Sequence, residues 1–184
     1  MTDGPTVDPV AGIHLVAYDD TWPERFRQER EVLSGAIGEY VKGSIEHVGS
    51  TAVAGLVAKP VIDVMVGVEG LAASRGAFPI LERLSYCYFP HHADVMHWFC
   101  KPSPQHRTHH LHLVPFRSRL WRERMAFRDY LRGHPEVAAE YGKLKQALAR
   151  RYRFDREAYT DAKKPFVRRI VERALSREAP AGGG

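Results

Sequence analysis

The sequence has 184 residues, 44% of them hydrophobic, which is enough to bury one core and fits the size of a single domain. Two cysteines, Cys87 and Cys100, are too few for a disulfide framework. The chain shows neither a signal-peptide start nor an apolar run of about 18 residues, so we expect a cytoplasmic protein with no membrane contact. The net charge is +5, and residues 117–184 carry 18 basic against 9 acidic side chains. Because these charges alternate, we interpret them as solvated helix faces, and binding of RNA by the Arg-rich helices is the less favoured alternative.

One domain is predicted over residues 11–175, with disordered tails at residues 1–10 and 176–184 that are rich in Pro, Gly and other small or polar residues. Residues 13–17 suggest a short strand. The segment that follows predicts a helix that ends near residue 38. Its start is marked by a capping box of Thr21 and Glu24, with Pro23 in the first turn.

Strands are predicted at residues 44–48 and 61–68. The second is a nearly continuous apolar run, typical of a strand covered on both faces. A helix over residues 71–84 follows, and then three β-like segments at 86–89, 95–100 and 109–114. We expect this middle region to extend the sheet by antiparallel pairing.

The last third of the chain is predicted to be helical, because apolar residues recur at helical spacing through residues 120–131 and 137–152. Asp155 is a suitable N-cap for a final helix, which Pro165 should kink or restart. Strands first and helices afterwards indicate an α+β fold, with a mixed sheet, helices packed on it and a helical C-terminal third.

The most informative stretch begins where a predicted strand ends in Gly49-Ser50-Thr51. Backbone N–H groups and hydroxyls at such a turn can hold phosphate oxygens, although the same residues are ordinary turn formers. Asp63 follows on an apolar strand, where a carboxylate is costly unless it is paired, hydrogen-bonded or bound to a metal. Two interpretations of Asp63 stay open: a functional carboxylate, or one that only accepts hydrogen bonds from the turn.

Histidines are concentrated further along the chain, where six fall within twenty positions and His112 lies just beyond. Strand alternation puts His110 and His112 on one face, so that both can point toward Asp63. Two imidazoles and a carboxylate suit Mn²⁺ or Zn²⁺ better than Mg²⁺. The alternative is that the imidazoles only form hydrogen bonds in a polar cleft, or bind an anion when protonated. The other histidines of this region are interpreted as loop and edge residues: His91, His92, His97 and His106.

A family resemblance rests on long motifs. The run from Ile45 to Val53, with Gly55-Leu56, Ala58-Lys59-Pro60 and Val61-Ile62-Asp63, resembles the GrpB family of predicted nucleotidyltransferases, whose members are sometimes fused to dephospho-CoA kinase. The resemblance extends over residues 13–172. Its later motifs are Arg107 with His109-His110-Leu111-His112, Phe127-Arg128-Asp129-Tyr130-Leu131-Arg132, His134-Pro135, Tyr141 with Leu144-Lys145, and Tyr159 with Lys163.

The resemblance implies a polymerase-β-type nucleotidyltransferase fold, in which a Gly-Ser turn holds nucleotide phosphates and acidic residues on neighbouring strands hold a divalent metal. Gly49 and Ser50 match that turn, and Asp63 matches the first carboxylate of the superfamily's Asp-x-[Asp/Glu] pair. The second position of the pair is Met65, a poor ligand for Mg²⁺. A two-metal site therefore cannot be assembled from this strand alone.

The leading prediction is a nucleotide-handling protein with metal-dependent nucleotidyl transfer. The alternative, which Met65 favours, is a non-catalytic accessory module that binds a nucleotide, a CoA-like ligand or a protein partner. Tyr159 and Lys163 share a helix face and suit contact with a base and a phosphate, or form an ordinary packed Tyr beside a solvated Lys. The predicted roles are phosphate binding by Gly49, Ser50, Thr51, Lys59 and Arg107, catalysis by Asp63, and binding of Mn²⁺, Zn²⁺ or Mg²⁺ by Asp63, His110 and His112.

Overall fold

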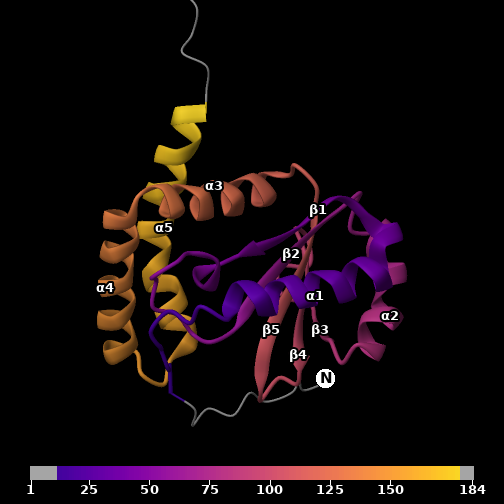
Figure 1. Cartoon of the computed structure of the whole chain (residues 1–184), viewed down its shortest axis with the longest axis horizontal. Coiled ribbons are helices and arrows are strands. Elements are labelled where there is room, and N and C mark those ends of the chain that lie inside the picture. Colours follow the sequence, from indigo (N-terminus) through magenta and orange to yellow (C-terminus); the bar gives the residue numbers. More distant parts are fainter. Residues whose placement is uncertain (1–11, 179–184) are drawn as a thin grey trace, which may run out of the picture.

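A five-stranded mixed sheet forms the centre of the molecule, seen in the computed structural model, which describes residues 12–178 (Figure 1). The spatial order of the strands is β1-β2-β5-β4-β3. Only β2 and β5 run parallel, and the other three neighbouring pairs are antiparallel, which confirms the expected α+β fold and its antiparallel extension. The strands are β1 (Val41–Val48), β2 (Ile62–Val68), β3 (Cys87–Phe89), β4 (His97–Pro102) and β5 (Arg107–Pro115).

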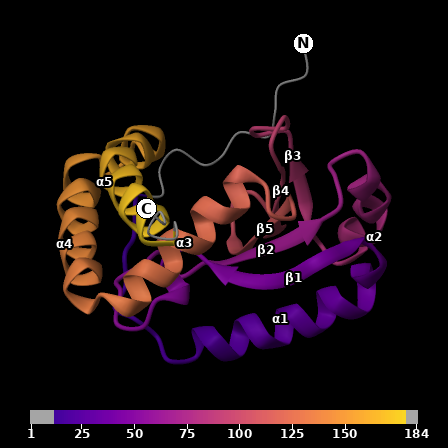
Figure 2. The ribbon, with the colours of Figure 1, turned by 90° about the horizontal axis from the view of Figure 1, so that it is seen from above.

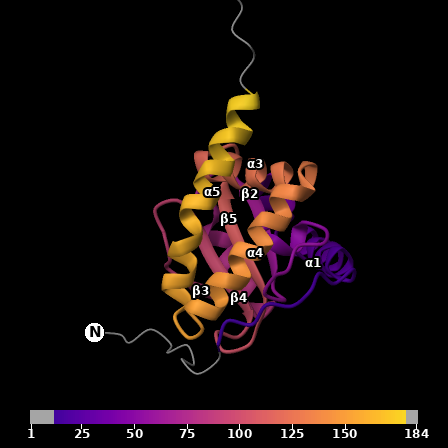
Figure 3. The same cartoon turned by 90° about the vertical axis from the view of Figure 1, so that its left-hand side faces the viewer.

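Helices cover both faces of this sheet. Two of them, α1 (Trp22–Ile37) and α2 (Phe78–Arg83), pack on one face, and α3 (Arg119–Gly133) packs on the other. The last two, α4 (Pro135–Arg151) and α5 (Arg156–Glu178), lie side by side at one end of the sheet (Figures 1 and 3). None of the helices in the described part of the chain is long and apolar enough to cross a membrane.

Alternation along β2 decides which side chains reach each face. Ile62, Val64 and Val66 are fully buried in the core formed with α1 and α2. Met65 packs on the opposite face with Trp121 of α3. Because side chains alternate, Asp63 lies on this second face, the one that α3 covers and that α4 and α5 flank (Figure 2).

The three C-terminal helices share a core of their own. It joins α3, α4 and α5 to the loop that follows the Gly49-Ser50 turn. The buried members of this helical core are Val53, Leu56, Leu131, Ala138, Tyr141, Phe166 and Ile170. The C-terminal helices are therefore anchored to the same segment that carries the predicted phosphate turn.

Several local predictions were wrong. Residues 13–17 form no named strand, and only Val16 makes an isolated bridge, to Ala58. The capping box at α1 is absent: the Thr21 side chain caps nothing, and the Asp19 carboxylate instead accepts a hydrogen bond of 2.8 Å from the Thr21 N–H. Pro23 does lie in the first turn of α1, as predicted.

The remaining differences concern helix boundaries. The helix predicted over residues 71–84 is a short 3₁₀ segment (Ala73–Ala77) followed by α2. The final helix begins after Asp155, which accepts from the Ala158 N–H at 2.9 Å as expected, but it continues through Pro165 without restarting. Residues 176–178, predicted to belong to a tail, continue α5, and the tails predicted at 1–10 and 179–184 lie outside the described residues.

Candidate functional site

The Gly49-Ser50 turn lies directly against Asp63. Val48, the last residue of β1, pairs with Asp63 on β2. Gly49 has φ of +73°, and a Cβ atom there would lie 3.0 Å from the Cβ and Cγ atoms of Asp63 and closer still to its Oδ2. Both the backbone conformation and the close approach therefore require glycine.

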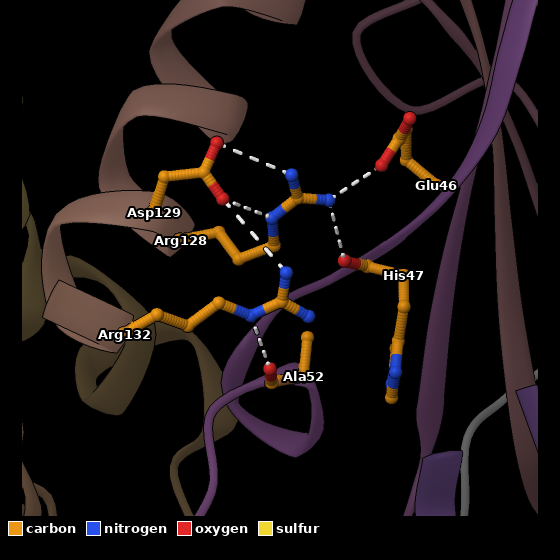
Figure 4. Close-up of polar contacts among 6 residues, drawn as sticks. All are labelled: Glu46, His47, Ala52, Arg128, Asp129 and Arg132. Carbon is orange, nitrogen blue, oxygen red and sulfur yellow. Dashed lines mark hydrogen bonds and ion pairs between the residues drawn. The ribbon is translucent and has the colours of Figure 1, made fainter. Parts of the chain in front are cut away.

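Two arginines of α3 hold the turn from one side (Figure 4). Arg128 is buried and donates to the backbone carbonyl of His47 at 3.1 Å and to the Glu46 carboxylate at 2.6 Å. Arg132 donates to the carbonyl of Ala52 at 2.8 Å. Because these bonds reach the residues just before and just after Gly49-Ser50, α3 fixes the path of the backbone through the turn.

The Thr51 side chain has a structural role. It is buried, its hydroxyl lies 2.9 Å from Nε2 of His47, and it donates to the carbonyl of Val61 at 3.3 Å. Burial lowers the pKa of His47 to about 4, so its imidazole is neutral at neutral pH. The Thr51 hydroxyl is thus occupied by protein partners, and the phosphate contact of Thr51 stays a prediction.

Asp63 faces both predicted histidines. Its Oδ1 atom is 2.9 Å from Nδ1 of His110, the residue paired with it on β5, and 3.7 Å from Nε2 of His112. Burial alone would raise the pKa of Asp63, but hydrogen bonding to the two histidines, above all to His110, brings it well below its usual range. Burial, with the Arg124 charge, lowers the pKa of His112 to about 3. Asp63 is therefore a stable carboxylate beside a neutral His112.

These three side chains do not fit a metal centre as they stand. Within residues 12–178, no group of three or more His, Cys, Asp or Glu side chains is arranged to hold a metal ion. Asp63 is instead bonded directly to His110. The basic side chains on which the Asp63 charge acts are Lys59, Arg124, Lys145 and Lys163. Such surroundings repel a divalent cation and attract an anion, and the metal centre stays a prediction from sequence.

Three of these cations form what we call the lysine cluster: Lys59, Lys145 and Lys163. Lys59 lies in the loop before β2, Lys145 on α4 and Lys163 on α5. The ammonium groups of Lys59 and Lys163 lie 4.9 and 4.2 Å from the ring centre of Tyr159. Burial lowers the pKa of Lys59 and Lys163 to about 8 and that of Lys145 to about 7. The positive charge of Lys163 further lowers the pKa of Lys59 and that of Lys145.

Lys145 joins the cluster to the turn. Lys145 is only 2% exposed, and its Nζ atom lies 2.9 Å from the Ser50 hydroxyl and also donates to the Val57 carbonyl. Sequence reasoning gave Lys145 no role, although its spacing of four from Tyr141 places both on one helix face. Both residues are buried, and Nζ lies 4.9 Å from the centre of the Tyr141 ring.

Arg107 borders the same region from the start of β5. Its guanidinium lies 5.3 Å from the centre of the Trp98 ring, and its charge contributes to lowering the pKa of Lys59. The interpretation of His97 as a loop or edge residue was wrong: it begins β4, an inner strand, it is buried, and its Nε2 lies 2.8 Å from the carbonyl of Leu71. The structure thus brings Gly49, Ser50, Lys59, Asp63, Arg107, His110 and His112 together, and adds Lys145 and Lys163 to them.

Comparison with known proteins gives a consistent family. A UPF0157 protein of Pseudomonas aeruginosa is 41% identical over 169 residues, covering 89% of this chain and 68% of that protein. The glutamate-rich protein GrpB of Alkalihalophilus pseudofirmus is 38% identical, covering 85% of this chain and 92% of that protein. A dephospho-CoA kinase of Mycolicibacterium paratuberculosis is 28% identical, and the match covers 46% of its length.

A solved structure and a family model indicate the same family as these relatives. The crystal structure of the conserved protein GrpB from Enterococcus faecalis superposes with a TM-score of 0.82 at 32% identity, covering 90% of this chain and 99% of that one. The family model described as GrpB protein matches residues 12–173, which span every strand of the sheet and most of α5. This chain therefore belongs to the GrpB family.

Proposed function

We propose that the chain binds the phosphate groups of a nucleotide, or of another phosphate-bearing small molecule, at the Gly49-Ser50 turn and the lysine cluster. The observation that carries this proposal is a set of three lysines from three separate elements: Lys145 bonds the Ser50 hydroxyl of the turn, and Lys59 and Lys163 lie against the same Tyr159 ring. The negative charge of Asp63 raises the pKa of all three lysines and so favours their charged forms. The excess of positive charge is unfavourable in the empty protein, and a bound polyanion offsets it.

Arg107 and Trp98 support a nucleotide as the ligand. The Trp98 ring is half-buried beside His110 and under the Arg107 guanidinium, so an aromatic surface and a cation border the lysine cluster. Aromatic rings stack on nucleobases, and Arg pairs with phosphate. One relative is named a dephospho-CoA kinase, which makes dephospho-CoA a second ligand to test.

Nucleotidyl transfer is the finer proposal. It rests on the family resemblance and on the carboxylate at Asp63, and the direct hydrogen bond between Asp63 and His110 weighs against a metal-dependent form of it. The accessory-module alternative needs the same phosphate site but no reaction. Binding is therefore the property to measure first.

Isothermal titration calorimetry with ATP, pyrophosphate and dephospho-CoA tests the binding proposal. Lys163→Met removes a cluster lysine, whereas Lys164→Met removes its exposed neighbour, which forms an ion pair with Asp161. We expect the first change to weaken binding by roughly 10-fold or more, because a charge-assisted bond to an anion contributes about 1.5–3 kcal/mol, and the second to leave it unchanged. Absence of binding for all three ligands, or equal effects of the two substitutions, would refute the proposal.

A further inference from the structure

Ser50 and Lys145 have the arrangement of a nucleophile and its base. The Ser50 hydroxyl is half-buried at the start of the turn, and the atom that lies 2.9 Å from it is Nζ of Lys145. Lys145 is oriented by a second bond, to the carbonyl of Val57. A hydroxyl within hydrogen-bond reach of a base that a third group holds in place is the usual geometry of an activated serine, and Ser-Lys pairs are one known form of it.

We propose that Ser50 and Lys145 form a nucleophile–base pair, through which the site takes a phosphoryl or nucleotidyl group from a bound phosphoanhydride onto the Ser50 hydroxyl. This inference rests on the proposed function, because the lysine cluster must first hold the phosphates next to Ser50. It goes beyond binding, since it assigns a covalent step and a catalytic residue.

The site and its ligand supply every group that this step needs. The neutral amine of Lys145 accepts the hydroxyl proton, and Oγ of Ser50 forms a bond to phosphorus. The bond from that phosphorus to the bridging oxygen breaks, and its electron pair stays on the departing phosphate or pyrophosphate, whose charge Lys59 and Lys163 stabilise. Water or an acceptor hydroxyl then attacks the phosphorus and displaces Ser50, whose Oγ regains its proton from Lys145, while the proton of the attacking group passes to solvent.

The surroundings of Lys145 suit it to this task. A lysine is a base only when it is uncharged, and burial lowers the pKa of Lys145 to about 7, so that both forms are present near neutral pH. The positive charge of Lys163 on α5 lowers the pKa of Lys145 further, whereas the negative charge of Asp63 on β2 raises it. The Tyr141 ring on the same helix packs against the amine. Lys143, two positions earlier on α4, is exposed and provides a matched control.

Diisopropyl fluorophosphate is a direct probe of the pair, because an activated serine displaces its fluoride and gains a mass that peptide mapping can locate. We expect labelling of Ser50 in the unmodified chain, at a rate that rises as the pH passes through about 7. Lys145→Arg keeps the positive charge and a donor for Ser50 but cannot act as a base at these pH values. It should slow labelling by roughly 100-fold or more. Lys143→Arg should change neither the labelling rate nor pyrophosphate binding.

The outcomes separate this inference from the proposed function. Unlabelled Ser50 across the pH range, or equal labelling rates in Lys145→Arg and the unmodified chain, would overturn the nucleophile–base pair even where pyrophosphate binds. Labelling of Ser50 that depends on Lys145, with no pyrophosphate binding by calorimetry, would support the pair and overturn the phosphate-binding proposal. A purely structural Lys145, which only holds the turn, predicts pH-independent labelling that Lys145→Arg preserves.

Discussion

Replacing Gly49 with Ala should destabilise the chain in two ways, through the backbone conformation at Gly49 and through a clash with Asp63. A non-glycine residue at φ of +73° costs about 1–2 kcal/mol of stability. The added methyl group would also collide with the Asp63 side chain, at 3.0 Å from its Cβ and Cγ atoms, and overpacking of this kind costs about 1–3 kcal/mol. We therefore expect Gly49→Ala to lower the free energy of unfolding by about 2–5 kcal/mol, measured by urea denaturation followed by circular dichroism.

Gly55 provides the matched control. Its φ is +75°, but within residues 12–178 no atom other than those of its chain neighbours lies within 4 Å of the Cβ position, so Gly55→Ala should carry the conformational cost alone, about 1–2 kcal/mol. In the Asp63→Ala background, the cost of Gly49→Ala should fall toward that of the control. If the two alanine substitutions destabilise the chain to within about 0.5 kcal/mol of each other, close packing of the turn against Asp63 is not what requires glycine there.

Three further predictions concern the buried charges. Arg128→Met leaves a buried carbonyl and a carboxylate without their donor, so it should cost about 2–4 kcal/mol in urea unfolding, whereas exposed Arg119→Met should have no measurable effect. Because the pKa of Lys145 is about 7 in the folded chain and near 10.5 when unfolded, the unfolded chain binds more protons between these values. Stability should therefore rise with pH across that window, and Lys145→Met should reduce the rise; an unchanged slope would contradict the lowered pKa. The metal centre predicted from the sequence requires that titration with Mn²⁺ or Zn²⁺ at neutral pH give heat that is lost in Asp63→Ala and kept in His91→Ala; no heat that depends on Asp63 would refute it.

Much of the fold could be predicted because apolar patterning reports burial directly. The run of β2 indicated a strand covered on both faces, and the spacing of the last third indicated helices. Local breaks were harder to foresee. The helix expected over residues 71–84 begins only at Phe78, because Pro79 occupies its first turn and Gly76 packs closely against the ring of Tyr40. The strand expected at residues 13–17 finds one bridging partner, Ala58, which lies in a loop.

The site was predictable only where its residues share strands. Alternation along β5 and the apolar flanks of Asp63 were sufficient to bring both histidines to the carboxylate. Lys145 could not be found in this way, because it meets Ser50 across 95 positions, and a helix period identifies a buried face without identifying what that face contacts. Arg128 and Arg132 entered only as part of a family motif, since nothing in their spacing indicates that they hold a distant turn.

The separate core of the three C-terminal helices has a consequence for how the site assembles. The turn and Asp63 belong to the sheet, whereas two of the three cluster lysines are on α4 and α5, which pack mainly on each other, on α3 and on the loop after the turn. A fluctuation that detaches α4 and α5 would leave the sheet intact and dismantle the site. Ligand would then protect the amides of these two helices from hydrogen exchange more than those of β2 and β5. A bound ligand would therefore also stabilise the packing of α4 and α5 against the rest of the molecule.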